Sequence, residues 1–285
     1  MSQLPDERIY YAQNREDLIL ESFFPDTKKG FYVDVGACHP HVASVTKRFY
    51  LKGWKGINIE PQTELCALFD IERKRDTNIS VAISDKEATA TMRAYVNNRG
   101  LTTFSPDMKN DYEHSKGNKT EEFEDIPIIT STLGNLLARQ EVESIQFLKV
   151  DVEGFEYEVL NGNDWSRFRP EVICIEANHV IKDWRSLLVK NKYEKVFFDG
   201  LNEYYVDRMT DRASKFNYVD HVVTNLKGGI ASDDFDLIEK ANRESREQAQ
   251  LVSQLERELQ SVKGMLKRTV LLLPSKIKTR LTKNK

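Results

Sequence analysis

The sequence predicts an α/β fold built on a doubly wound, mostly parallel sheet. Three observations lead to this prediction. Short apolar runs without polar alternation are typical of strands that are covered on both faces. Helical segments separate these runs, as expected for parallel strands joined by crossovers. Near residue 200, an Asp-Gly pair stands between two β-rich runs and indicates a hairpin.

The elements follow in regular order from residue 31. The expected strands are FYVDV (31–35), GINIE (56–60), NISVAIS (78–84), IQFLKVD (145–151) and EVICIEA (171–177). The expected helices are SVTKRFYLKG (44–53), QTELCALFDIER (62–73) and FEYEVLNG (155–162). Gly53 and Gly162 are suited to ending a helix, and Pro61 to stopping a strand. The sheet should therefore be wound with helices on both faces.

The segment YEKVFFDGLNEYYVD (193–207) predicts an antiparallel edge after the parallel strands. A second region, from about 97 to 125, fits neither the strand nor the helix pattern, because it is polar and interrupted by glycine and proline. Such a long connection is either a functional cover or irregular chain. Within it, we expect GLTTFS (100–105) to be ordered.

Composition and charge narrow the functional classes. Among 285 residues there are 42 basic and 45 acidic side chains, and seven of the basic ones lie in 267–285. The preceding body is therefore acidic, which disfavours a nucleic-acid partner. The first twenty residues predict neither a signal peptide nor a membrane span, so we expect a cytoplasmic protein. Three scattered cysteines, Cys38, Cys66 and Cys174, indicate neither disulfides nor a zinc site.

Polar residues follow the first two predicted strands. In open α/β sheets, ligands bind beyond the carboxyl ends of the strands, where Asp34 and Gly36 are expected. A glycine lets a ligand approach the backbone, and a carboxylate can accept hydrogen bonds from ribose hydroxyls. Glu60 ends the next strand and is placed for the ribose. The pattern G-x-G-x-x-G is absent, so a nucleoside without a pyrophosphate fits better than NAD or FAD.

Several stretches together resemble the FkbM family of S-adenosylmethionine-dependent methyltransferases. They are YAQNREDLIL, FYVDVGACHP, GWKGINIEP, VAISD, FLKVDVEGFEYEVLNG and RPEVICIEANH, in this order between about 10 and 207. The resemblance implies a class I methyltransferase (Rossmann-like) sheet of seven strands with the last antiparallel. It also implies S-adenosylmethionine as cofactor. By position, the cofactor residues would be Gln13, Asp34, Gly36, Glu60, Ser84, Asp85 and Asp151, with Asp17 beside Gln13 in an N-terminal cover.

Methyl transfer needs alignment of the acceptor with the methyl group, and a base if the acceptor is a hydroxyl. The candidate catalytic residues are His179, Asp151 and Glu176, at the ends of the fourth and fifth parallel strands. His179 is the candidate base because imidazole titrates near neutrality, although it could equally cap a loop. Asp151, Glu153 and Glu176 could instead hold Mg²⁺. His39 and His41 are expected to serve a turn.

The resemblance implies an O-methyltransferase that acts on a hydroxyl of a glycan or glycan precursor. The alternative is a non-catalytic, methyltransferase-like scaffold in a surface-polysaccharide assembly complex. Domain boundaries are expected at 1–229 for the methyltransferase domain, 230–266 for a coiled-coil helix and 267–285 for a basic tail.

The predictions for the two C-terminal segments, 230–266 and 267–285, depend on the spacing of apolar residues and on charge. Apolar positions recur every three or four residues over 238–266, as in a coiled coil that pairs with itself or with a partner. A single helix lying on the domain is the alternative. The basic tail suits peripheral contact with an anionic membrane, and a disordered solubilising end is equally compatible with it.

Overall fold

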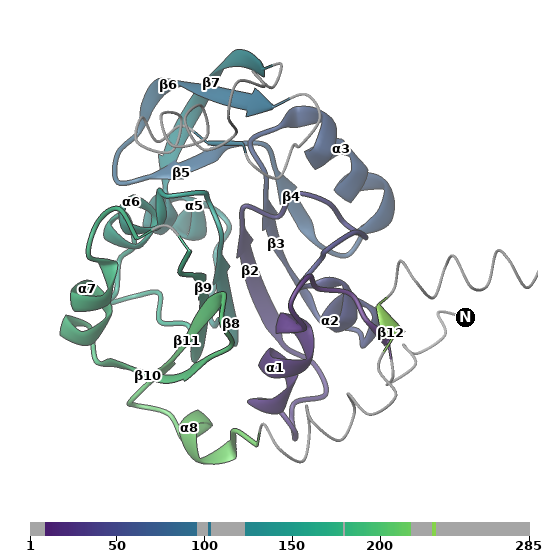
Figure 1. Cartoon of the computed structure of the whole chain (residues 1–285), viewed down its shortest axis with the longest axis vertical. Helices are drawn as coiled ribbons and strands as arrows, with labels where there is room; N and C mark the ends of the chain where they lie inside the picture. The colour runs from purple at the N-terminus through teal and green to yellow at the C-terminus, as the bar shows by residue number, and fades with distance from the viewer. Residues whose placement is uncertain (1–8, 96–101, 104–122, 179, 218–229, 232–285) are drawn as a thin grey trace, which may run out of the picture. The chain divides into compact units, whose positions relative to one another are not determined.

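A computed structural model of the chain describes residues 9–95, 102–103, 123–178, 180–217 and 230–231. The chain divides into two units, Met1–Ser232 and Asp233–Lys285, and the fold and the site described below belong to the first. A seven-stranded sheet forms the middle layer of this unit, with helices on both of its faces (Figure 1). The predicted mixed α/β fold with a mostly parallel sheet is confirmed.

The main sheet has the strand order β4-β3-β2-β8-β9-β11-β10. Its strands are β2 (Phe31–Val35), β3 (Lys55–Ile59), β4 (Thr77–Ile79), β8 (Phe147–Val150), β9 (Val172–Glu176), β10 (Tyr193–Phe198) and β11 (Asn202–Asp207). Strand β11 runs antiparallel to both of its neighbours, and the other pairs in this sheet are parallel. The predicted hairpin at the edge is confirmed as β10 and β11, and β11, the last strand of this sheet along the chain, is antiparallel as the resemblance implied. It lies between β9 and β10, because the hairpin returns inward.

Seven helices are described in this unit. They are α1 (Glu16–Ser22), α2 (Lys47–Leu51), α3 (Thr63–Glu72), α5 (Leu133–Arg139), α6 (Glu156–Asn161), α7 (Trp184–Lys190) and α8 (Arg212–Lys215). The helices expected at 44–53, 62–73 and 155–162 correspond to α2, α3 and α6. Side-chain caps begin two others, since Thr132 Oγ1 accepts from the Asn135 N–H at 3.2 Å and Asp183 Oδ1 from the Ser186 N–H at 3.1 Å.

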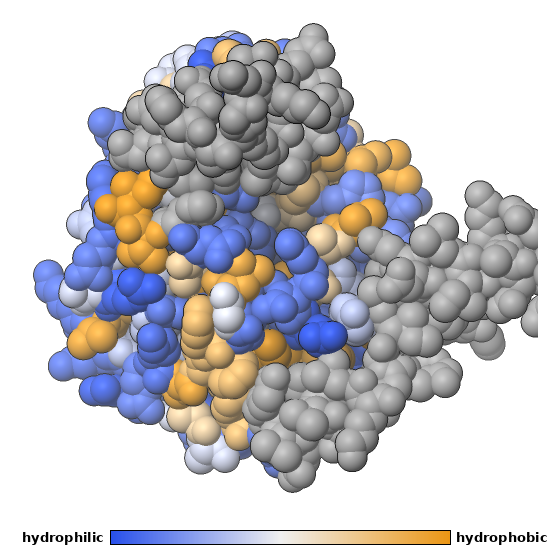
Figure 2. Space-filling view, viewed as in Figure 1, coloured by the Kyte–Doolittle hydropathy of each residue, from blue (hydrophilic) through white to orange (hydrophobic). Residues whose placement is uncertain are grey.

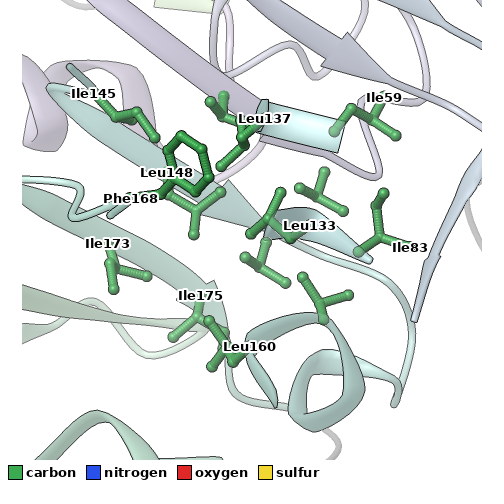
Figure 3. Packing of buried hydrophobic residues seen from close by; sticks show 14 of the residues in the cluster. Ile59, Ile83, Leu133, Leu137, Ile145, Leu148, Leu160, Phe168, Ile173 and Ile175 are labelled. Carbon is green, nitrogen blue, oxygen red and sulfur yellow. The ribbon is translucent and has the colours of Figure 1, made fainter. Parts of the chain in front are cut away.

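Side-chain alternation along the strands divides the core into two clusters. On one face, Leu133 and Leu137 of α5 pack with Leu148 of β8 and Ile173 of β9 (Figure 3). Helices α6 and α7 contribute to the same cluster. On the other face, side chains of α1 and α2 pack with the alternate residues of the same strands. Both faces of the central strands are therefore covered, which explains their continuous apolar character.

A separate sheet of three strands lies at one end of the main sheet, at the top of Figure 1. It has the order β5-β7-β6, with β5 (Ala82–Ser84), β6 (Ala88–Tyr95) and β7 (Phe123–Thr132). The single strand predicted at 78–84 is wrong. The chain leaves the main sheet after Ile79 and enters the accessory sheet at Ala82, because the backbone pairs first with β3 and then with β7.

A short parallel pair joins β1 (Ile9–Tyr10) to β12 (Ile230–Ala231). The predicted coiled coil and basic tail lie outside the described residues. Among the helices that are described, none combines the length and apolar character needed to cross a membrane. Hydrophilic residues cover much of the described face in Figure 2, and hydrophobic residues gather there in separate areas.

Candidate active site

The turn after β2 is fixed by a backbone contact at Gly36. Its φ of 78° is in the region that favours glycine, and a Cβ built there would stand 1.8 Å from the carbonyl oxygen of Asp151. The residue was expected to be glycine so that a ligand could approach. Instead, the loop after β8 approaches it, so the turns that follow two neighbouring strands are in direct contact.

Asp34 is buried below this turn, with 1% of its surface exposed. One carboxylate oxygen accepts a hydrogen bond from the Thr46 hydroxyl at 3.1 Å, and the other lies 3.5 Å from Nζ of Lys149. Asp34 thus helps to anchor the chain that follows β2. Its assignment as a cofactor residue stays a prediction.

Glu60 directly follows β3 and is 4% exposed. Its two carboxylate oxygens accept hydrogen bonds from the backbone N–H groups of Cys38 at 2.9 Å and Gln62 at 2.8 Å. Burial raises the pKa of Glu60 to about 7, and these hydrogen bonds oppose the rise. Each oxygen has a second lone pair, so a ribose hydroxyl could still be accepted. The carboxylate also ties the loop after β2 to the start of α3.

The N-terminal cover residues differ in accessibility. Gln13 is exposed, whereas Asp17 is fully buried and accepts the N–H of Tyr11 at 2.8 Å. Burial raises the pKa of Asp17 to about 7. Asp17 therefore orders the turn before α1, and of the two only Gln13 can reach a ligand without rearrangement.

Ser84 and Asp85 follow β5, the strand that leaves the main sheet. Ser84 is buried, and its carbonyl oxygen lies 2.3 Å from a Cβ built at Gly162. Glycine at the end of α6 is therefore required by this close approach. Asp85 is exposed. Their predicted position on the adenine side is not tested by these contacts.

Three carboxylates gather beyond β8 and β9. Asp151, Glu153 and Glu176 each offer an oxygen, and these oxygens lie within 4.8 Å of one another. All three residues are half-buried. Burial, followed by the charges of Asp151 and Glu153, raises the pKa of Glu176 to about 10. Glu176 therefore holds a proton at neutral pH, and the cluster can accommodate either that proton or a cation.

The loop after β8, which carries Asp151 and Glu153, is held from both sides. Glu156 accepts the N–H of Gly154 at 3.0 Å, and burial raises the pKa of Glu156 to about 7. From the other side, the Thr103 hydroxyl donates to the carbonyl oxygen of Glu153 at 2.8 Å, and the backbone of Thr103 is itself bridged to Arg93 of β6. Glu153 has a φ of 52°, which is unusual for a side chain larger than glycine. The loop is thus fixed in a conformation that it would not favour alone.

Three residues that hold the loops of the site were missed by sequence reasoning. Lys149 pairs with both Asp34 and Asp151, and its only signal is a lysine inside an apolar strand. Arg73 is fully buried and donates to the carbonyl oxygens of Pro40 at 2.6 Å and Thr46 at 3.2 Å, so it supports the loop after β2. Thr103 lies in the predicted ordered stretch 100–105, but its contact depends on tertiary structure.

The histidines divide into a described and an undescribed group. The candidate base His179 lies outside the described residues. Nδ1 of His39 accepts from the backbone N–H groups of His41 at 3.1 Å and Val42 at 3.0 Å, which is the expected turn role.

A pocket of about 290 Å³ lies between the start of α3 and the accessory sheet. It is lined by residues 61–64, 80–82 and 126–129 and by Met92. The strand-end carboxylates are not among its lining residues. It is therefore distinct from the carboxylate cluster.

A family comparison identifies the domain that carries this sheet. The model of the methyltransferase FkbM domain matches residues 34–209, more than half of the chain. The chain belongs to the FkbM methyltransferase family. This membership confirms the predicted family and supports a methyltransferase activity.

One solved structure in the same family is a methyltransferase FkbM from Methylobacillus flagellatus KT. It is 14% identical to this chain, with a TM-score of 0.39, and the match covers 63% of this chain. The matched part spans 44% of that protein's length. Curated proteins gave no match to this chain.

Proposed function

We propose that the protein is an S-adenosylmethionine-dependent O-methyltransferase that acts on a hydroxyl of a glycan or glycan precursor. The observation that carries this proposal is the convergence of acidic residues at the carboxyl ends of β2, β3, β8 and β9. Family membership supplies the methyltransferase activity. The choice of acceptor follows from the sequence resemblance alone.

The residues at these strand ends fit an adenosyl cofactor with a cationic group. Glu60 would hold the ribose hydroxyls through the lone pairs that its two backbone donors leave unused. Asp151, whose side chain is 36% exposed, offers a carboxylate to the amino group. When bound, S-adenosylmethionine supplies an electrophilic methyl group on sulfur. The protein has then to orient the acceptor oxygen and remove its proton.

The proton of the acceptor hydroxyl requires a base at the carboxylate cluster or at His179. Glu176 is unsuited to this role at neutral pH, since its raised pKa of about 10 keeps it protonated. Asp151 and Glu153 lie beside it and can accept the proton instead. If Mg²⁺ bound the three carboxylates, it would replace the proton of Glu176 and would acidify the hydroxyl.

Calorimetric titration with S-adenosylmethionine, followed by mass spectrometry of candidate acceptors, tests the proposal. We expect binding, and a mass gain of one methyl group on a carbohydrate acceptor. The surface variant Glu194→Gln serves as a control that should bind like the wild type. Binding without transfer to any acceptor would favour the scaffold alternative, and absence of binding would refute the cofactor assignment.

A chelator separates the two ways of activating the hydroxyl. With a protein base, activity should survive chelation and fall in His179→Ala. With Mg²⁺, chelation should abolish activity and added Mg²⁺ should restore it. Retention of activity in both experiments would exclude His179 and Mg²⁺, and would leave Asp151 or Glu153 as the base or positioning alone.

The C-terminal segments support a proposal about partners. The spacing over 238–266 favours self-association or pairing with another coiled coil. A truncated chain should keep β12, which pairs with β1, and should therefore end at Ser232. We expect this chain to be a monomer that binds S-adenosylmethionine, and the full chain to be a weak oligomer. Light scattering that gives a monomer for both would contradict the pairing.

The basic tail supports peripheral contact with anionic membranes, to which each positive charge contributes about 1 kcal/mol near the surface. Removing the residues after Met265 should abolish binding to anionic vesicles at low salt. The oligomer should persist, because the apolar positions of 238–266 and the basic residues of 267–285 are separate features. Equal vesicle binding by both lengths would assign the contact to another surface.

A further inference from the structure

Lys149 is a buried cation in the middle of the main sheet. It lies on β8, and strand alternation directs its side chain to the face covered by α1 and α2, away from that of Leu148 and Val150. The side chain is 10% exposed. A buried ammonium group is costly unless it is paired and hydrogen-bonded, so its partners indicate why it is there.

The partners of Lys149 come from two parts of the site: Asp34 and Gly36 from the end of β2 and the turn after it, and Asp151 from the turn after β8. Nζ donates a hydrogen bond to the carbonyl oxygen of Gly36 at 2.8 Å. It also lies 3.5 Å from Oδ1 of Asp34 and 3.3 Å from Oδ2 of Asp151. Two carboxylates and one carbonyl oxygen therefore surround the ammonium group and pair its charge.

The two turns above Lys149 are also joined through their backbones. The Asp151 N–H donates to the Val35 carbonyl at 3.0 Å, and the Asp151 carbonyl fills the space where a Cβ of Gly36 would stand. These contacts fix the backbone of Asp151 but not its side chain. Lys149 is the cation that orients that carboxylate from below.

The accessibility of the two carboxylates separates an anchoring role from a functional one. The side chain of Asp34 is 2% exposed, and its pairing with Lys149 can be explained by the need to neutralise a buried charge. The side chain of Asp151 is 36% exposed, so water could solvate it without any partner. The contact of Lys149 with Asp151 is therefore not needed to neutralise a buried carboxylate, and it serves instead to orient the Asp151 side chain.

We propose that Lys149 is a positioning residue that couples the cofactor turn at Gly36 to the Asp151 carboxylate and so holds Asp151 ready for the ligand. This inference rests on the proposed function and deepens it, because it identifies what aligns the two halves of that site. Lys149 acts through Asp151 and does not itself contact the substrate.

Calorimetric titration of Lys149→Met with S-adenosylmethionine tests the proposal. We expect the dissociation constant to rise at least about tenfold, because Asp151 and the Gly36 carbonyl lose their common partner. Lys149→Arg keeps the charge and should recover affinity to within about fivefold of the wild type. Arg169→Met removes another partly buried cation, which pairs with Asp207 at 2.8 Å at the opposite ends of the strands. It should cost stability and leave the dissociation constant unchanged.

A double-mutant cycle distinguishes positioning from general weakening. If Lys149 acts through Asp151, Lys149→Met in the Asp151→Asn background should weaken binding by less than about twofold more. A purely structural effect would be additive and would give the full tenfold loss again. Additive losses, or a folded Lys149→Met protein with wild-type affinity, would overturn the proposal.

Two further controls make every result interpretable. If Lys149→Met does not fold because Asp34 is left buried without a counter-charge, the Asp34→Asn/Lys149→Met protein is compared with Asp34→Asn alone. The same tenfold loss is expected, and equal affinities would refute the coupling. Wild-type protein that fails to bind S-adenosylmethionine would instead refute the proposed function, which is a separate outcome.

Discussion

The two halves of the candidate site use carboxylates in opposite ways. At the ends of β2 and β3, Asp34 and Glu60 are buried and held by hydrogen bonds from a hydroxyl and two backbone N–H groups. At the ends of β8 and β9, Asp151, Glu153 and Glu176 lie together with their oxygens within 4.8 Å. In the first half, hydrogen bonds reach both oxygens of Glu60 and one oxygen of Asp34, whose other oxygen lies 3.5 Å from Nζ of Lys149. The second half contains like charges that repel one another.

This difference separates a scaffold from a reactive centre. A carboxylate whose oxygens already accept hydrogen bonds is rigid and can recognise a ligand with little reorganisation. A cluster of carboxylates is stabilised when it binds a proton or a cation, so its chemistry depends on what is bound. The first half should therefore govern stability, and the second should respond to pH.

Substitution of Gly36 should give the largest effect, and it tests the contact between the two halves. Gly36→Ala combines a positive φ with a Cβ 1.8 Å from the Asp151 carbonyl oxygen, so we expect a loss of more than about 3 kcal/mol in the free energy of unfolding. Gly53 also has a positive φ, of 90°, but has no neighbour within 4 Å of an added Cβ. Gly53→Ala should cost only about 1–2 kcal/mol. Equal losses of stability for the two variants in urea denaturation would show that Gly36 is not in close contact with the turn after β8.

The next effect concerns Glu60. Glu60→Ala leaves two backbone N–H groups without their acceptor in a buried place, so we expect a loss of about 2–3 kcal/mol in stability. Affinity for S-adenosylmethionine should fall by about 1.5–3 kcal/mol as well. Glu64→Ala, an exposed carboxylate of α3, is the control. Unchanged stability and affinity would remove Glu60 from both roles.

A smaller effect should distinguish the second half by its pH dependence. The folded pKa of Glu176, about 10, exceeds its ordinary value of 4.5, so the folded state holds a proton that the unfolded state releases. The free energy of unfolding should therefore fall as pH rises from 4.5 towards 10, by at most about 1.4 kcal/mol per pH unit. Glu176→Gln should flatten this slope.

Chemical denaturation between pH 7.5 and 9.5 measures that slope, in a window set by the raised pKa values of the other buried carboxyls. Burial raises the pKa values of Asp17, Glu60 and Glu156 to about 7, so these groups contribute mainly below the window. An equal pH dependence of the free energy of unfolding for the wild type and Glu176→Gln would mean that the pKa of Glu176 is not raised by its neighbours.

The smallest effect tests whether Thr103, which is bridged to Arg93 of β6, supports the second half. Thr103→Val removes the hydrogen bond to the Glu153 carbonyl and should cost about 1 kcal/mol in the free energy of unfolding. Thr103→Ser keeps the hydroxyl and should cost less. Thermal denaturation of the two variants gives the comparison, and a greater loss in the serine variant would contradict a role for the hydrogen bond.

Much of the fold could be predicted because its signals are local. The apolar runs at 31–35, 56–60 and 171–177 correspond to strands of the main sheet, and glycines at 53 and 162 follow helices. The run at 78–84 was misassigned because its two halves pair with different strands. No local property distinguishes Ile79, which pairs within the main sheet, from Ala82, which pairs with β7. Strand choice is a matter of partners far along the chain.

The sequence by itself determined the family, the mostly parallel sheet and the position of acidic residues at strand ends, because apolar periodicity, turn residues and short motifs are read along the chain. Only the tertiary structure decided which of these acidic residues lie together in one site and which accept hydrogen bonds that hold the loops in place. Lys149 lies beside Asp34 through strand register, and Glu60 meets the Cys38 N–H through the turn at Gly36. These contacts join residues that are 22 to 115 positions apart. Burial and charge at such meeting points depend on packing, and so the pKa of Glu176 and the orientation of Asp151 are properties of the folded chain.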